Sequence, residues 1–116
     1  MDEMKTNQIE GLTIEKVEPI YSFSYTQAGY MAEGTTIVCL YENRLLVKHI
    51  TVYTNGAPSS EANYIQAIKN IARVDFFINA KEVKVMINNS PLIQTPNTIE
   101  NAEKVKTLVS LLEERL

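Results

Sequence analysis

The chain has one cysteine, Cys39, and one histidine, His49, and these two residues limit the chemistry that its side chains can perform. A zinc site of the usual Cys/His kind and a histidine-ligated iron site both need more of these ligands. Cys39 lies in an apolar run, residues 36–41, where a lone cysteine is typically a small buried hydrophobe. His49 follows Lys48 in a predicted strand, and no partner for acid–base work can be identified. We therefore expect no metal, no cofactor and no catalytic residues, and we predict that the protein is not an enzyme.

The motifs of common nucleotide-processing enzymes are missing from the sequence. The four glycines, at positions 11, 29, 34 and 56, are isolated, so neither Gly-x-Gly-x-x-Gly nor a Gly-Lys-Thr loop occurs. There is also no Gly-x-Ser-x-Gly nucleophile elbow. Acidic residues outnumber basic ones, 14 to 11, for a formal charge of −3. We therefore expect no long nucleic acid as a partner, and any anion site must be local.

Aromatic, amide and basic side chains are the groups of this chain that could contact a ligand with a flat ring and a phosphate. Phe76 and Phe77 are adjacent and cannot both face the core, so one is free to stack on a flat ring. Arginine offers a rigid fork for phosphate, and asparagine can pair with a nucleobase edge. Each residue also has an ordinary interpretation, because aromatics build cores, asparagines form turns and surface cations are usually solvated. The candidate ligand-binding residues are Phe76, Phe77, Asn88, Asn89, Lys106, Arg115, Arg44 and Arg73.

The first half of the chain has the patterns of strands. Between Tyr21 and Thr26, aromatic and small polar residues alternate, which is the period of a sheet with one buried face. The sequence Gln27-Ala28-Gly29 predicts a turn, and a short polar segment, residues 42–44, predicts a hairpin. Continuous apolar runs indicate that both sheet faces are buried in places, with an oligomer partner as one candidate for the cover. The predicted strands are residues 12–17, 21–26, 35–41 and 45–53.

The second half predicts two helices with two strands between them. Ser59 or Ser60 can cap a helix that ends at Phe77, since apolar residues recur there at spacings of three and four. Strands follow at residues 83–87 and around residues 92–93, joined by a turn at Asn89-Ser90. Asn97 or Thr98 can cap the last helix, whose apolar stripe extends to Leu116. We favour a core role for that stripe, with a subunit interface as the alternative.

These elements predict a single α+β domain over residues 1–116. The expected fold is an antiparallel sheet in the order ββββ-α-ββ-α, with the helices packed on one face. Residues 1–8 are expected to be loosely held. They lack the apolar stretch of an export signal, and no apolar run in the chain approaches the roughly 18 residues of a membrane span. We therefore expect a cytoplasmic protein without a membrane partner.

The layout resembles that of the phage anti-Thoeris proteins, which sequester cyclic ADP-ribose signals. The likeness covers most of residues 9–116. It is carried by the strand-rich first half, the helix start Ala-Pro-Ser-Ser-Glu-Ala-Asn-Tyr at residues 57–64, the Asn88-Asn89 turn, and a last helix with Lys106 and Arg115.

The resemblance implies a non-catalytic, homo-oligomeric sponge that antagonises bacterial anti-phage defence in the host cytoplasm. Phe76 or Phe77 would stack on adenine, Asn89 would meet a polar edge, and Lys106 or Arg115 would hold the pyrophosphate of a cyclic ADP-ribose isomer. Some members also hold cyclic oligonucleotides at a separate site. The alternative is a small inhibitor or adaptor that acts through protein–protein contact, which the net acidity and the polar strands favour.

Overall fold

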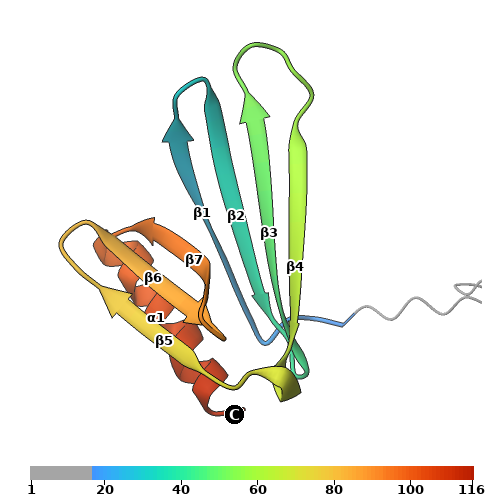
Figure 1. The fold of residues 1–116 in the computed structure, drawn as a ribbon, viewed down its shortest axis with the longest axis vertical. Coiled ribbons are helices and arrows are strands. Elements are labelled where there is room, and N and C mark those ends of the chain that lie inside the picture. The colour runs from blue at the N-terminus through green and yellow to red at the C-terminus, as the bar shows by residue number, and fades with distance from the viewer. Residues whose placement is uncertain (1–16) are drawn as a thin grey trace, which may run out of the picture.

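The computed structural model describes residues 17–116, which form a four-stranded sheet, a three-stranded sheet and one α-helix (Figure 1). The α+β class is therefore confirmed. The strand predicted at residues 12–17 lies outside the described residues except for Val17, which is in no strand. The expectation of a loosely held segment at residues 1–8 also lies outside them.

The larger sheet is an antiparallel meander in the order β1-β2-β3-β4. Its strands are β1 (Tyr21–Gly29), β2 (Ala32–Leu40), β3 (Arg44–Tyr53) and β4 (Ser60–Ala67). The strands predicted at residues 21–26, 35–41 and 45–53 and the hairpin between the last two of them are thus confirmed. The turn predicted at residues 27–29 is wrong, because β1 continues until Gly29 pairs with Ala32. Tyr30 and Met31 form the loop instead, and Met31 takes the positive φ of 61° that this short loop requires.

The smaller sheet is also antiparallel, and the helix follows it. Its strands are β5 (Val74–Ile78), β6 (Glu82–Ile87) and β7 (Ser90–Pro96), and the helix is α1 (Ile99–Glu113). The turn between β6 and β7 consists of Asn88 and Asn89, one residue earlier than predicted, and both have positive φ. Thr98 caps α1, as expected, because its side chain accepts a hydrogen bond from the amide of Asn101 at 3.0 Å.

The predicted helix between residues 59 and 77 is wrong. That segment forms β4, a short 3₁₀ turn, η1 (Ile68–Asn70), and then β5. Strand β3 offers β4 a backbone ladder that runs from Arg44↔Ala67 to Thr51↔Ser60, and such tertiary pairing overrides local periodicity. The single sheet with two helices on one face is therefore corrected to two sheets, with one α-helix among residues 17–116.

The core lies between one face of the larger sheet and the layer formed by α1 and the smaller sheet. Val38, Leu40, Leu45 and Val47 point to this covered face and are 0% exposed. The stripe of α1 supplies the opposite wall, so its predicted role in the core is confirmed, although Leu116 is exposed. The buried residues of this stripe are Ala102, Val105, Leu108, Val109 and Leu112.

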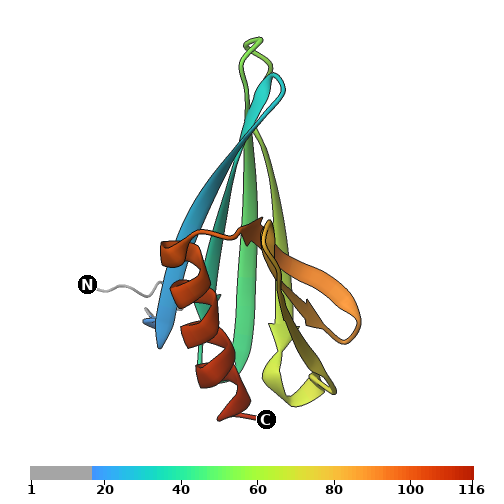
Figure 2. The same cartoon turned by 90° about the vertical axis from the view of Figure 1, so that its left-hand side faces the viewer.

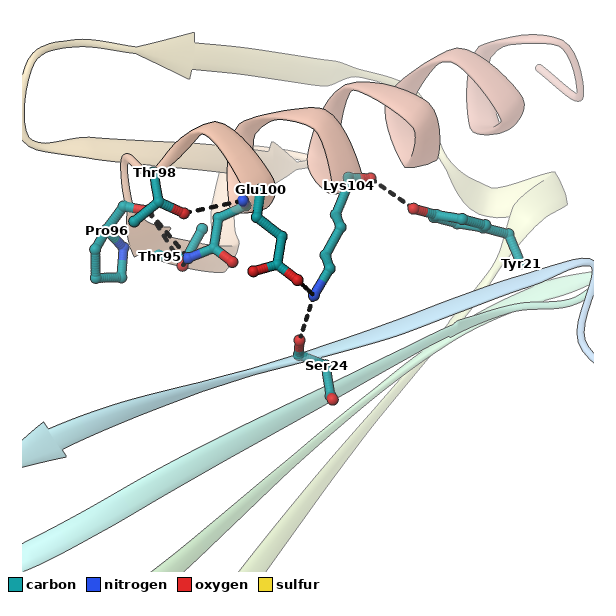
Figure 3. A network of polar contacts seen from close by, with 8 residues as sticks. Tyr21, Ser24, Thr95, Pro96, Thr98, Glu100 and Lys104 are labelled. Carbon is teal, nitrogen blue, oxygen red and sulfur yellow. Dashed lines mark hydrogen bonds and ion pairs between the residues drawn. The ribbon is translucent and has the colours of Figure 1, made fainter.

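Polar contacts fix α1 to both sheets (Figure 3). The carbonyl of Lys104 accepts from the Tyr21 hydroxyl at 3.3 Å, and Lys104 Nζ donates to the carbonyl of Ser24 at 3.4 Å. At the start of the helix, Asn101 Nδ2 donates to Thr95 Oγ1 at 2.8 Å. Tyr25 connects the two sheets directly, because its hydroxyl accepts from the amide of Gln94 at 3.3 Å.

The larger sheet extends well past the layer that covers it. Both α1 and the smaller sheet lie against one end of the sheet, and the opposite ends of β1–β4 project beyond them (Figures 1 and 2). Tyr30, in the projecting β1–β2 loop, is almost fully exposed. Within residues 17–116, no helix has both the length and the apolar character that crossing a membrane requires.

The buried hydroxyl of Tyr25 leads to a prediction about alkaline pH. Burial raises the pKa of Tyr25 above its ordinary value of 10.0, so the folded chain holds this proton more tightly than the unfolded chain does. The free energy of unfolding should therefore fall as pH rises above about 10, by up to ~1.4 kcal/mol per pH unit from this group. Tyr25→Phe should remove this part of the decline. It should also lower stability by about 1–3 kcal/mol at neutral pH, because it leaves the Gln94 amide without its acceptor.

Urea unfolding of both proteins across this pH range measures the two effects. Tyr30→Phe is the matched control, since Tyr30 lies in an exposed loop. A decline of the same slope in wild type and Tyr25→Phe would contradict the assignment to Tyr25.

Candidate functional site

The basic pocket is a cavity of about 540 Å³ at the covered end of the larger sheet. Three parts of the chain meet there: the β2–β3 loop, the end of β4 with η1, and the last turn after α1. The residues that line the basic pocket are Glu42, Asn43, Arg44, Ile65, Ala67, Ile68, Lys69 and Arg115. Volumes of this size are typical of small-molecule sites.

The basic pocket gathers positive charge in an acidic protein. Arg44, Lys69 and Arg115 line it, against one carboxylate, that of Glu42. The three cations come from segments that are far apart in sequence, so it is the fold that brings them together. An anion with several oxygens, such as a phosphate or pyrophosphate, matches this arrangement.

The guanidinium of Arg115 is held in place by the protein, but not all of its hydrogen-bond donors have a partner in the described part of the chain. Its Nη1 donates to the carbonyl of Leu111 at 2.8 Å, and its Nη2 lies 3.6 Å from Glu42 Oε1. The Nε atom is buried, and no residue among 17–116 accepts a hydrogen bond from it. A buried donor without an acceptor is costly, so a small reorientation of this guanidinium toward an added oxygen would be favourable.

Arg44 is held flat by an aromatic ring. Its guanidinium carbon lies 4.2 Å from the centre of the Tyr41 ring, and its Nη1 donates to Asn43 Oδ1 at 3.0 Å. This cation–π contact fixes the plane of the guanidinium and leaves its remaining N–H groups for other acceptors. Lys69, which is exposed on η1, adds a mobile point charge.

Apolar side chains form the rest of the basic pocket. Ile68 is buried beneath it, whereas Ile65 is 70% exposed beside it. A surface isoleucine next to fixed cations can accept the flat face of a ring while the cations hold a charged group. The pocket therefore suits a ligand with both an anionic and an apolar part.

Two of the predicted ligand-binding residues, Arg44 and Arg115, meet in the basic pocket, and the other six do not line it. Phe76 packs against the core and Phe77 is 48% exposed, with Lys84 Nζ 5.5 Å from the centre of its ring. Strand alternation, rather than a helix, therefore separates the two rings, with Phe76 toward the core and Phe77 toward solvent. Arg73 pairs with Asp75 at 2.8 Å, and Lys106 is exposed on α1.

Asn88 has a structural role in the β6–β7 turn. Its Oδ1 accepts from the amides of Ala72 and Arg73 at 2.7 and 3.1 Å, and its Nδ2 donates to the carbonyl of Asn70 at 3.0 Å. The side chain therefore ties the turn to the segment between η1 and β5. Asn89 occupies the second turn position, with φ of 68°.

Lys69 and Tyr41 are not among the candidate ligand-binding residues that the sequence indicates, because arginine is the better phosphate ligand. The helix expected up to Phe77 would place Lys69 on the face opposite its apolar residues, and the apolar run of residues 36–41 makes Tyr41 the end of a strand. The contact between Tyr41 and Arg44 could have been predicted from the segment Tyr41-Glu42-Asn43-Arg44, because a tight connection between two strands brings residues three apart close together.

A second hollow lies between the two sheets. It consists of adjoining cavities of about 370 and 280 Å³, both lined by His49, Pro91 and Leu92. His49 Nδ1 lies 2.9 Å from the Thr36 hydroxyl, and its ring meets the edge of Tyr64 at 5.7 Å between centroids. Among residues 17–116, no Asp, Glu, Lys or Arg lines either cavity. The basic pocket is therefore the better candidate for a charged ligand.

Comparison of the chain with protein-family models, with curated proteins and with solved structures found no match. Across residues 17–116, no group of three or more His, Cys, Asp or Glu side chains is placed to hold a metal ion. Because a fold alone does not determine an activity, function has to be inferred from the side chains of the basic pocket.

The structural role of Asn88 predicts unequal effects of two glycine substitutions. Glycine accepts positive φ without strain, so Asn88→Gly removes only the side-chain hydrogen bonds and should lower the free energy of unfolding by about 1–2 kcal/mol. Asn89→Gly, the matched control, should change it by less than about 0.5 kcal/mol. Urea denaturation compares them. Equal losses in both variants would show that the contacts of Asn88 contribute nothing to stability.

The lone carboxylate of the basic pocket predicts a gain in anion affinity. Glu42→Gln removes the negative charge that faces Arg115, so the affinity for inorganic pyrophosphate should rise about fivefold, or ~1 kcal/mol for an exposed charge. Calorimetric titration at low salt measures this change. Glu103→Gln, on the exposed side of α1 and outside the pocket, should leave the affinity unchanged. Weaker binding by Glu42→Gln would rule out the pocket as the anion site.

Proposed function

We propose that the protein is a non-catalytic binding protein that captures a phosphate-bearing, nucleotide-derived small molecule in the basic pocket. The observation that carries this proposal is the convergence of Arg44, Lys69 and Arg115, from three separate segments, on one cavity of about 540 Å³. Isolated surface cations are commonplace, whereas three around one hollow form a site for a multiply charged anion.

Different side chains of the basic pocket would bind different parts of the ligand. The guanidinium groups of Arg44 and Arg115 would each take two oxygens of a pyrophosphate, and Lys69 would neutralise the remaining charge. Ile65 lies beside these cations and provides a surface for a flat base. Binding of this kind needs no bond to be broken, and Glu42, the one carboxylate that residues 17–116 contribute to the pocket, is in an ion pair with Arg115. These features favour capture over turnover.

The ligand we propose is a cyclic ADP-ribose isomer, which combines a pyrophosphate with adenine. Holding such a signal would antagonise a bacterial anti-phage defence, as the resemblance to anti-Thoeris proteins implies. Cyclic oligonucleotides carry the same two chemical elements and are the second class to test. The support for both is the pairing of cations with apolar surface in the basic pocket.

A second candidate function is inhibition of a protein partner. The observation that favours it is the apolar face of the larger sheet that no described part of the chain covers, since exposed apolar patches often mark protein contacts. In that case the biological target would be a protein, and the basic pocket would serve no ligand.

Incubation of the purified protein with cyclic ADP-ribose isomers and cyclic di- and trinucleotides, followed by heating and mass spectrometry of the released molecules, tests the proposal. Intact ligand in the eluate is the expected result. Ligand at 100 times Kd should also stabilise the folded protein by about 2.7 kcal/mol, seen as a higher Tm. A chemically altered ligand would indicate an enzyme, and an empty eluate would favour the protein inhibitor.

Substitutions identify the residues that hold the ligand. Arg115→Gln and Arg44→Gln should each weaken binding at least tenfold, because each removes a charge-assisted contact of about 1.5–3 kcal/mol. Lys106→Gln is the matched control, since Lys106 is a cation outside the pocket, and it should bind as the wild type does. Loss of binding only in Lys106→Gln would move the site to α1, as the resemblance implied.

A further inference from the structure

The larger sheet has a second face, and this face is rich in apolar side chains. Residues that alternate with the buried ones along β2, β3 and β4 point away from α1 and the smaller sheet. We call this the uncovered face. Its apolar residues are Ile37, Cys39, Leu46, Ile50, Val52 and Ile65, and none of them is fully buried. Cys39, expected to be buried, is thus only half-buried and lies on this face.

Exposure of these apolar side chains to water is unfavourable. An antiparallel sheet with one solvated side usually alternates apolar and polar residues, whereas β2 and β3 carry apolar residues on both sides. Val52 is 52% exposed in β3, where Leu45 and Val47 of the covered face are 0% exposed, and Ile65 in β4 is 70% exposed. No element of residues 17–116 packs on this side, so nothing in that part of the chain buries these side chains (Figures 1 and 2).

We propose that a second copy of this chain packs on the uncovered face, so that the two larger sheets form a face-to-face sandwich. This dimer does not require the ligand proposed for the basic pocket, although Arg44 and Ile65 belong to both surfaces. Two sheets whose inner faces are apolar pack about 10 Å apart, with strand directions within about 30° of each other.

The charges on the uncovered face are arranged to match a second copy of the same face. Arg44 lies at one end of the face, where Lys69 and Arg115 also gather, and Glu33 lies toward the other. Lys48 and Glu61, between these ends, are 3.5 Å apart, so each neutralises the other. When two copies stack with their strands reversed, the basic end of one lies over the acidic end of the other. Such self-complementarity is the property of a two-fold interface.

The size of the face also suits a dimer. Four strands at about 4.8 Å spacing and eight residues at about 3.3 Å each cover roughly 500 Å² in projection. Side-chain relief raises the accessible area toward the roughly 800 Å² per partner of a standard interface. A non-specific contact between two proteins usually buries less area than this, and it lacks the apolar residues that lie at the centre of a specific interface.

Sedimentation velocity and light scattering of the full chain, over a range of concentrations, test the dimer. The wild type should have twice the mass of one chain. Leu46→Lys places a charge at the centre of the face, so it should sediment as a monomer while keeping the wild-type circular dichroism spectrum. Ile99→Lys is the matched control, because Ile99 is 87% exposed at the start of α1, and it should remain a dimer. A monomeric wild type, or a Leu46→Lys variant that stays dimeric, would overturn the proposal.

A charge exchange tests the orientation of the two copies. Glu33→Arg and Arg44→Glu should each weaken dimerisation at least tenfold at low salt, because each places like charges opposite one another. The double variant restores opposite charges and should recover most of the affinity. If the double variant is as weak as the two changes combined, the reversed-strand stacking is wrong.

Discussion

The apolar core that β2, β3 and α1 share is the feature on which the rest of the structure depends. The two central strands supply Val38, Leu40, Leu45 and Val47, which have no exposed surface and belong to one hydrophobic cluster with the apolar stripe of the helix. Burying an aliphatic side chain of this size stabilises a protein by about 1.5–3 kcal/mol, more than any one polar contact between the layers. The same packing also places the last turn of the chain beside the β2–β3 loop, where the basic pocket forms.

Much of the fold could be predicted where one face of an element is buried. The alternation of Tyr21, Phe23 and Tyr25 and the stripe of α1 both indicated the correct element, because each buries one side against the core. The segment between residues 59 and 77 misled the same reasoning. Its apolar residues recur at spacings of three and four, but Tyr64 and Ile65 are exposed, and a free edge of β3 determines the structure there. Sequence periodicity does not reveal which strand edges are available.

The candidate site could be predicted only in part, for a related reason. The choice of arginine as a phosphate ligand pointed to Arg44 and Arg115, which the fold brings to one pocket. Lys69 joins them because the chain turns at η1 rather than continuing as a helix. The two asparagines were chosen for their amide groups, yet Asn88 uses its own on the backbone of residues 70–73. The sequence shows which hydrogen-bonding groups a side chain has. It does not show which of those groups are already occupied by contacts within the fold.

The basic pocket joins segments from opposite ends of the described chain. Glu42 and Arg44 lie in the β2–β3 hairpin, whereas Arg115 follows the last helix, so their meeting closes a loop that contains most of the described chain. Contacts of such long range form late in folding, because the entropy of loop closure must be offset by structure made before them. A chain with its first hairpins formed but without a docked α1 therefore has no complete pocket. The protein would therefore bind its ligand only once it is fully folded, and partly folded chains would not bind it.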